Sequence, residues 1–85
     1  MTIEQAWRPT RAPEVLTEDF GDAIVLYDPR TDRFHRLNAA GRVLWLACDG
    51  NATLHEISRS TELPIHTRDT IAAFLKQLSE EELLV

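Results

Sequence analysis

The hydrophobic pattern of this 85-residue sequence changes its period at Asn38, and that change limits the folds open to the chain. Before Asn38, apolar residues cluster in short β-type runs separated by turn residues. After it, they recur at the three- and four-residue spacings of helices. Strands followed by helices, rather than alternating with them, predict an α+β domain built on an antiparallel sheet. A chain of this length buries only about 60–65% of its unfolded surface, so it has room for one core.

Three strands are predicted in the first half, over residues 15–17, 23–27 and 33–37. The second is apolar throughout and β-branched in its middle, which is typical of a buried strand. Gly21 with its acidic neighbours marks the turn before it, and Pro29 with two aspartates marks the turn after it. Short turns between consecutive strands give a small antiparallel meander.

Two helix starts carry recognisable caps. Asn38 can accept from the first turn of a helix that runs to about Cys48, and Gly50 suits the left-handed position that follows its end. Thr53 and Glu56 then form a capping box, in which each side chain satisfies a free amide of the other. The sequence therefore predicts two helices with a short connection between them.

The second helix is expected to end near Pro64, and Thr67 caps a third. The inward stripe of this third helix comprises Ile71, Phe74, Leu75 and Leu78. The apolar tail 83–85 is expected to pack back onto the core. Three strands followed by three helices suggest a winged helix-turn-helix-like arrangement with its sheet first. Residues 1–12 are expected to form an N-terminal arm on the domain 13–85, with Trp7 pinned against it. The alternative is an arm that becomes ordered only with a partner.

Composition argues against several classes of function. The net charge is −5 and the pI is near 5.0, which disfavours a partner held by phosphate charge. A winged-helix nucleic-acid-binding protein is kept as an alternative hypothesis. The single cysteine, Cys48, excludes an internal disulfide and fits a reducing compartment. No apolar run could span a bilayer and no signal-peptide pattern is present, so we expect a cytoplasmic protein without a membrane partner.

Catalytic and metal-binding patterns are also missing from the sequence. His35, His55 and His66 fall in three different predicted elements, without the HxH or HxxxH spacing of a metal site. Cys48 lies on an apolar helix, where it is expected to act as a small core residue rather than a nucleophile. We therefore expect no enzymatic activity, no cofactor and no metal.

The residues from 30 to 42 carry a local excess of positive charge, with Arg30, Arg33, Arg36 and Arg42 against Asp32. Such a strip either belongs to a solvated surface or faces a carboxylate-bearing partner, which arginine pairs well.

The third predicted strand, 33–37, has the position of a sheet edge. An extended peptide adding to this edge would gain backbone hydrogen bonds, and a neighbouring helix would supply side-chain pockets. In the third helix, Arg68, Ala72 and Lys76 share one line, where the small Ala72 would leave room. The alternative interpretation is tight packing beside solvated charges. The open edge also permits pairing with a second copy, giving a homodimer that would compete with a peptide.

At this point the sequence resembles a known family. The segments 26–28, 33–45, 49–50, 53–57 and 74–85 follow in order and spacing the PqqD-like proteins, the precursor-peptide recognition elements (RREs) of ribosomally made, post-translationally modified peptides (RiPPs). The resemblance covers roughly residues 13–85 and is most specific from Leu37 to Ile57. Within the family, the segment around Phe34–Asn38 is most similar to the stand-alone proteins of lasso-peptide biosynthesis.

The resemblance implies a non-catalytic adaptor that binds the leader of a precursor peptide as an added strand and delivers it to a processing enzyme. For lasso pathways that enzyme is a cysteine leader peptidase. Alternatives are a peptide chaperone for a radical SAM enzyme and a regulatory subunit that binds an enzyme without any peptide. Carried onto this sequence, the implied peptide-binding residues are Arg33, Phe34, His35, Arg36 and Leu37 on the strand and Arg68, Ile71, Ala72, Leu75 and Lys76 on the helix. Either alternating set of strand side chains can face the peptide, and Leu37 and Leu75 can equally be core.

Overall fold

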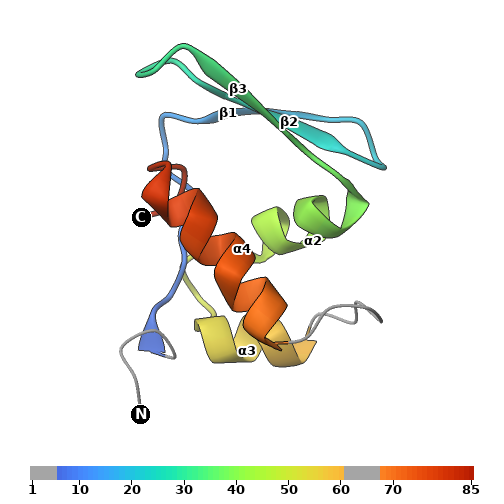
Figure 1. Cartoon of the computed structure of the whole chain (residues 1–85), viewed down its shortest axis with the longest axis vertical. Helices are drawn as coiled ribbons and strands as arrows, with labels where there is room; N and C mark the ends of the chain where they lie inside the picture. Colours follow the sequence, from blue (N-terminus) through green and yellow to red (C-terminus); the bar gives the residue numbers. More distant parts are fainter. Residues whose placement is uncertain (1–5, 61–67) are drawn as a thin grey trace.

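The computed structural model of the chain describes residues 6–60 and 68–85, and the side chains of all of these except Ser60, Arg68 and Asp69. The strands are β1 (Leu16–Asp19), β2 (Ile24–Asp28) and β3 (Arg33–Leu37). The helices are α2 (Ala39–Ala47), α3 (Leu54–Ser60) and α4 (Arg68–Glu80). The sheet is antiparallel in the order β1-β2-β3, and the helices lie together beneath one of its faces (Figure 1). The predicted α+β class is confirmed.

The second and third strands lie close to where the sequence placed them, but the first is shifted. It runs to Asp19 because Glu18 and Asp19 pair with Val25 and Ile24 instead of forming a wide turn. Gly21 makes the tight turn possible, with a φ of 87° that favours glycine. The Asp19 Oδ1 atom accepts from the Gly21 amide at 2.8 Å and so stabilises the turn.

The core lies between the sheet and the helices. Ile24 and Leu26 of β2 are buried on the helix-facing side, whereas Val25 and Tyr27 are only partly buried on the other side. From the helices the core receives mainly Leu44, Trp45, Cys48, Leu54, Ile57, Ile71, Leu75 and Leu78. The predicted burial of Cys48 is confirmed.

The helix caps follow the sequence. Asn38 Oδ1 accepts from the Gly41 amide at 2.8 Å. The capping box is complete, since the Thr53 amide donates to Glu56 Oε1 at 2.9 Å and the Glu56 amide donates to Thr53 Oγ1 at 3.1 Å. Gly50 has a φ of 84°, as its predicted left-handed position requires. The expected helix end near Pro64 and the Thr67 cap lie outside the described residues.

The N-terminal residues described run between the end of the chain and the α2–α3 connection. Thr10 and Val85 exchange backbone hydrogen bonds of 3.2 and 2.7 Å, and the Arg11 amide donates to the Cys48 carbonyl at 3.0 Å. Trp7 packs against the core. The final residues are held in turn, since Leu83 and Leu84 are buried. The expected packing of the apolar tail is confirmed for these two residues, whereas Val85 is exposed.

An ion pair joins the sheet to α2. Arg42 Nε donates to Asp19 Oδ1 at 2.7 Å, and Arg42 NH2 donates to Oδ2 at 2.8 Å. These bonds, together with the Gly21 amide, lower the pKa of the Asp19 carboxyl from 3.8 to about 2.

We expect Asp19→Asn to make stability less sensitive to acid. Because the pKa of Asp19 is lower in the folded protein than in the unfolded chain, its ion pair stabilises the fold fully only above the unfolded value of 3.8. This contribution is lost as the pH falls from there through about 2. Urea unfolding of both proteins across this range should show their stabilities converging at the acid end. Asp22→Asn, an exposed change in the same turn, serves as control, and a constant difference at every pH would contradict the expectation.

Candidate functional site

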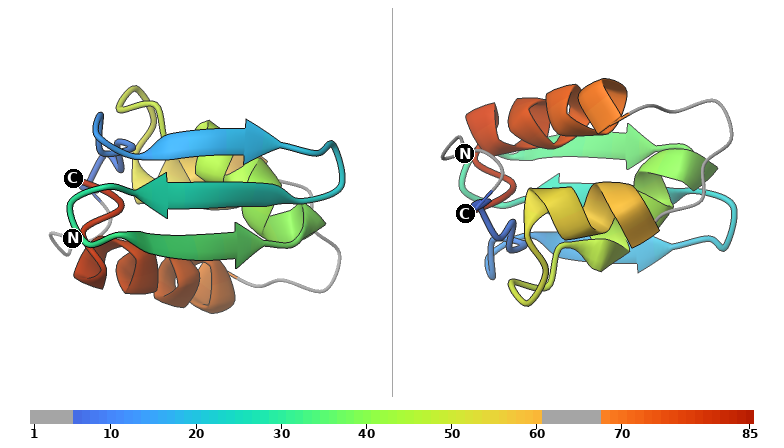
Figure 2. Two further views of the ribbon diagram at one scale, coloured as in Figure 1. Left: turned by 90° about the horizontal axis from the view of Figure 1, so that it is seen from above. Right: turned by 90° about the horizontal axis from the view of Figure 1, so that it is seen from below.

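β3 is an edge strand, and α4 runs alongside its unpaired edge. Both views of Figure 2 place α4 next to β3, on the side away from β2. One contact bridges the two elements, from His35 Nδ1 to Glu81 Oε2 at 3.2 Å, just beyond the end of α4. The unpaired edge of β3 and the adjacent side of α4 therefore make up the candidate site.

Within residues 6–60 and 68–85, no strand pairs with the backbone groups at this edge of β3. The amide of Phe20, the residue after β1, donates to the Ala23 carbonyl at 2.9 Å. The backbone groups of Ala23 therefore point toward β1. Along a strand these groups alternate between the two sides, which turns Leu26 toward its partner His35 on β3. Phe34 and Arg36 then direct their N–H and C=O groups away from β2. Two residues of β3 thus present donors and acceptors to the side where α4 lies.

The side chains of β3 divide between the two faces of the sheet. His35 and Leu37 point toward the helices, since Leu37 is buried in the core and His35 reaches Glu81. Phe34 lies on the outer face, where its ring packs against that of Tyr27 with centroids 4.6 Å apart. Alternation places Arg36 on the same outer face. A strand added to the edge would continue both faces.

The residues of α4 that approach β3 are not those predicted from the sequence, where Arg68, Ala72 and Lys76 were expected to face the peptide. Thr70 and Phe74 line a hollow with the start of α2, and Glu81 reaches His35. Because a helix turns about 100° per residue, Ala72 lies about 200° around α4 from Phe74. Lys76 shares that distant side and is exposed.

Two other predicted helix residues lie in the core. Ile71 is 1% exposed and Leu75 is 0% exposed. With Leu37 of β3 they belong to the core that lies beneath the site. The backbone of Arg68 begins α4, and its side chain lies outside the description.

A hollow of about 140 Å³ lies beyond the last residue of β3 and was missed in the sequence. It is lined by Asn38, Ala40, Gly41, Leu44, Thr70 and Phe74. Gly41 is the lining residue that lets α2 pack closely against Leu37 and Phe74. A Cβ at that position would lie 3.2 Å from the Phe74 ring and 3.0 Å from the Leu37 Cβ. The sequence signal was a glycine inside a helix, which commonly marks close packing.

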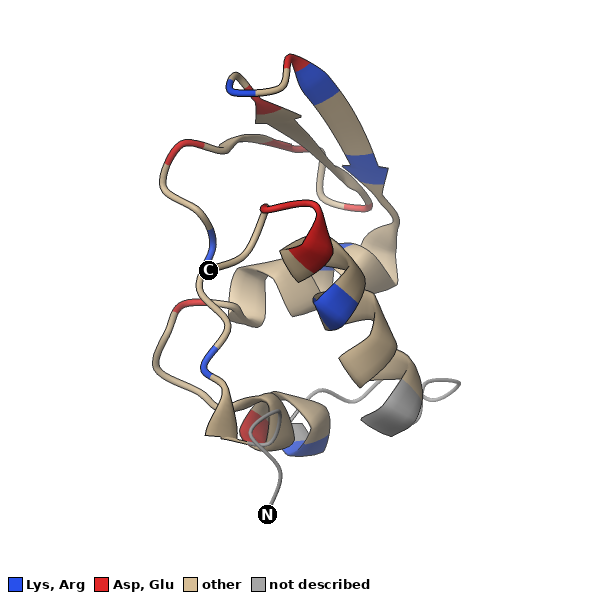
Figure 3. Ribbon diagram, turned by 60° about the vertical axis from the view of Figure 1, so that its left-hand side comes forward, with Lys and Arg blue, Asp and Glu red and all other residues tan. Residues whose placement is uncertain are grey.

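The positive strip predicted from residues 30–42 is largely neutralised. Arg30 donates to both carboxylate oxygens of buried Asp28, at 2.9 and 3.1 Å, and Arg42 is paired with Asp19. The Arg30 guanidinium holds the pKa of Asp28 below its usual value. Arg33 and Arg36 remain exposed on β3, whereas acidic residues follow at the end of α4 (Figure 3). The site therefore carries both signs of charge, and the excess of three positive charges read from the sequence overstates its field.

Within the described ranges, no three His, Cys, Asp or Glu side chains gather where they could hold a metal ion. No helix of that part of the chain is long and apolar enough to cross a membrane.

The buried thiol of Cys48 is unreactive. Its Sγ donates to the Leu44 carbonyl at 3.2 Å, and burial raises the pKa of the thiol to about 12. We expect iodoacetamide at pH 8 to leave Cys48 unmodified in the folded protein and to alkylate it in guanidinium, as followed by intact mass. Alkylation of the folded protein at the rate of the unfolded chain would contradict this burial.

A three-stranded meander followed by helices, with one strand edge open beside the last helix, defines an α+β domain of the winged-helix type. The family model described as coenzyme PQQ synthesis protein D (PqqD) matches residues 23–84. The chain therefore belongs to the PqqD family, and the resemblance read from its sequence is confirmed.

A search of curated proteins gives no match. Among solved structures, the chain is similar to one described as "TbiB1 in Complex with the TbiA(beta) Leader Peptide". The two share 25% sequence identity with a TM-score of 0.73, over 88% of this chain and 93% of that one.

Proposed function

We propose that this protein is a non-catalytic adaptor that binds the leader region of a ribosomally made precursor peptide as a fourth strand beside β3. The observation that carries the proposal is the open backbone edge of β3 facing α4, in a chain of the PqqD family. The similar TbiB1 structure, a complex with a leader peptide, supports the same class of partner.

Binding would combine backbone pairing with side-chain recognition. The outward N–H and C=O groups of Phe34 and Arg36 would join the leader to the sheet. An apolar leader side chain would enter the hollow lined by Ala40, Thr70 and Phe74. Arg33 would pair a leader carboxylate. Glu81, which contacts His35 between Arg33 and Arg36, favours a basic leader residue near the middle of β3. In this arrangement Ile71 and Leu75 support the site from the core. Ala72 and Lys76 lie on the far side of α4 and contribute least to contact with the leader.

A leader held in this way leaves the rest of the precursor free for a processing enzyme. We assign the delivery step to a cysteine leader peptidase, as in lasso-peptide pathways, acting in the cytoplasm where the precursor is made. A radical SAM enzyme is the alternative recipient within the family. Co-purification of the protein with each candidate enzyme, with and without precursor, separates these two partners from a regulatory subunit that needs no peptide.

Fluorescence anisotropy with a labelled cognate leader tests peptide binding. The wild-type protein should saturate, and no saturable binding at tens of micromolar would overturn the proposal. Ala40→Leu fills the hollow and should weaken binding about tenfold, because the apolar anchor loses its place. Ala39→Leu is the matched control, since the neighbouring Ala39 is exposed and does not line the hollow. Equal losses in the two variants would show that the hollow does not receive the leader.

A further inference from the structure

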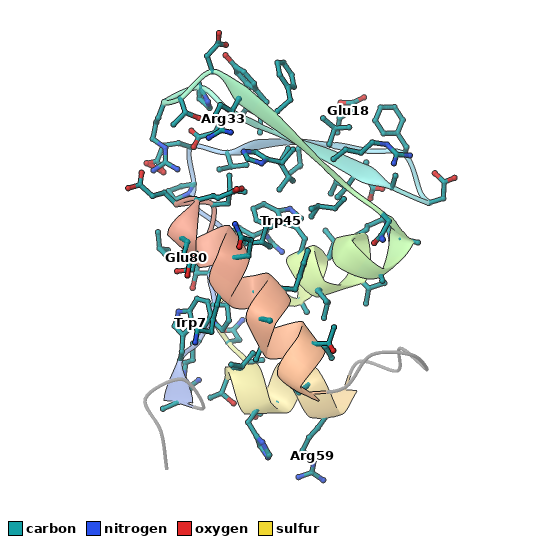
Figure 4. All side chains as sticks on the ribbon, viewed as in Figure 1. Trp7, Glu18, Arg33, Trp45, Arg59 and Glu80 are labelled. Atoms are coloured by element: carbon teal, nitrogen blue, oxygen red, sulfur yellow. The ribbon has the colours of Figure 1, made fainter. Side chains whose placement is uncertain are left out.

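The outer face of the sheet is uncovered by any described element. The helices lie on the opposite side, and in Figure 4 the labelled Glu18 points away from them. Large apolar side chains are nonetheless exposed here, Phe34 by 71% and Leu16 by 60%. Contiguous apolar surface of this kind commonly marks an interaction site.

Two cross-strand rows make up this outer face. Leu16, Tyr27 and Phe34 form the first row, from β1 across β2 to β3. Glu18, Val25 and Arg36 form the second. The first row is apolar and aromatic. The second has an acid at one edge of the sheet, an apolar centre and a base at the other edge.

We propose that this outer face docks a second copy of the same chain. A twofold axis parallel to β2 turns the face over and places β1 of one copy above β3 of the other, while each row stays at its own level. Leu16 then meets Phe34, and Glu18 meets Arg36. Tyr27 meets its own counterpart at the centre. The face is therefore complementary to itself in both charge and apolar character, as a twofold interface requires.

Such a dimer would follow the usual packing of two sheets. Two sheets that pack face to face lie about 10 Å apart with their strands roughly aligned. In this arrangement the apolar row is buried, and the two ion pairs lie at the rim, where they set the register. The open edge of β3 and α4 remain outside the interface. This dimer therefore differs from one formed by pairing of strand edges, which would occupy the site proposed for the peptide.

Sedimentation equilibrium over a range of concentrations tests the inference on the whole chain. The wild-type protein should approach twice its mass of 9.7 kDa as concentration rises. Glu18→Arg and Arg36→Glu should each raise the dimer dissociation constant about tenfold, because like charges then face each other. The double variant E18R/R36E should restore dimerisation. Leu46→Glu, on an exposed leucine of α2 outside this face, should have no effect.

Three results would overturn the proposal. These are a mass of 9.7 kDa at every concentration, a double variant no better than the single ones, and an equal effect of Leu46→Glu. Adding a leader peptide separates this dimer from edge pairing. A face dimer keeps its mass with peptide bound, and E18R binds peptide as well as wild type, whereas peptide would dissociate an edge-paired dimer. The mass measurements stand by themselves, so failure of leader binding would leave them unchanged.

Discussion

Replacing Arg36 by proline is expected to weaken leader binding at least about tenfold while the protein stays folded. The Arg36 amide points away from β2, so its loss breaks no hydrogen bond within the sheet. The same amide is a donor that an added strand needs, and the proline ring also obstructs its close approach. Anisotropy titration of the labelled leader, with circular dichroism to verify folding, measures both parts of the expectation.

The matched control is Thr17→Pro on β1. Glu18 pairs with Val25, whose backbone groups face β1, so the amide of the preceding Thr17 points to the outer edge of that strand. Thr17→Pro therefore removes an edge amide from the opposite side of the same sheet and should bind the leader as well as wild type. Wild-type affinity in Arg36→Pro would show that the leader does not pair with β3.

Leu75→Ala is expected to lower the free energy of unfolding by about 2–5 kcal/mol, because it leaves a cavity in the core. Leu75 is 0% exposed and packs in the cluster beneath the sheet. Against a total stability of about 5–15 kcal/mol for a typical domain, this loss is large. Urea unfolding measures it directly.

Leu46→Ala provides the comparison for Leu75→Ala, since Leu46 is an exposed leucine on α2. Its effect should stay within about 0.5 kcal/mol, as for other surface substitutions. A Leu75→Ala protein with wild-type stability and much weaker peptide binding would show that Leu75 contacts the peptide instead of supporting the core.

Local signals in the sequence were sufficient for much of the fold. The Asn38 cap and the Thr53–Glu56 box each depend on residues three apart, so a reader of the chain can find them. The edge strand 33–37 was also predictable from its turn and partial alternation. The first strand was placed less well, because its acidic end is held by pairing with β2 and by Arg42.

The helix wall of the site was not predictable in the same way. The apolar stripe of α4 fixes which side faces the core, but the stripe has two flanks. One flank contains Phe74 and the other Ala72, and the sequence alone does not say which flank lies beside β3. The tertiary arrangement decides this, through the close approach of Phe74 to Gly41. The net charge of the segment 30–42 was overestimated for a related reason, since Asp19 and Arg42 meet only in the folded chain.

The pair of backbone hydrogen bonds between Thr10 and Val85 has a consequence for folding during synthesis. The sheet can form early in synthesis, but Leu83 and Leu84 complete the core and hold the arm that precedes β1. Joining such distant segments closes a long loop, which slows folding. On the ribosome, the complete core therefore becomes reachable only after Leu83 and Leu84 have left the exit tunnel.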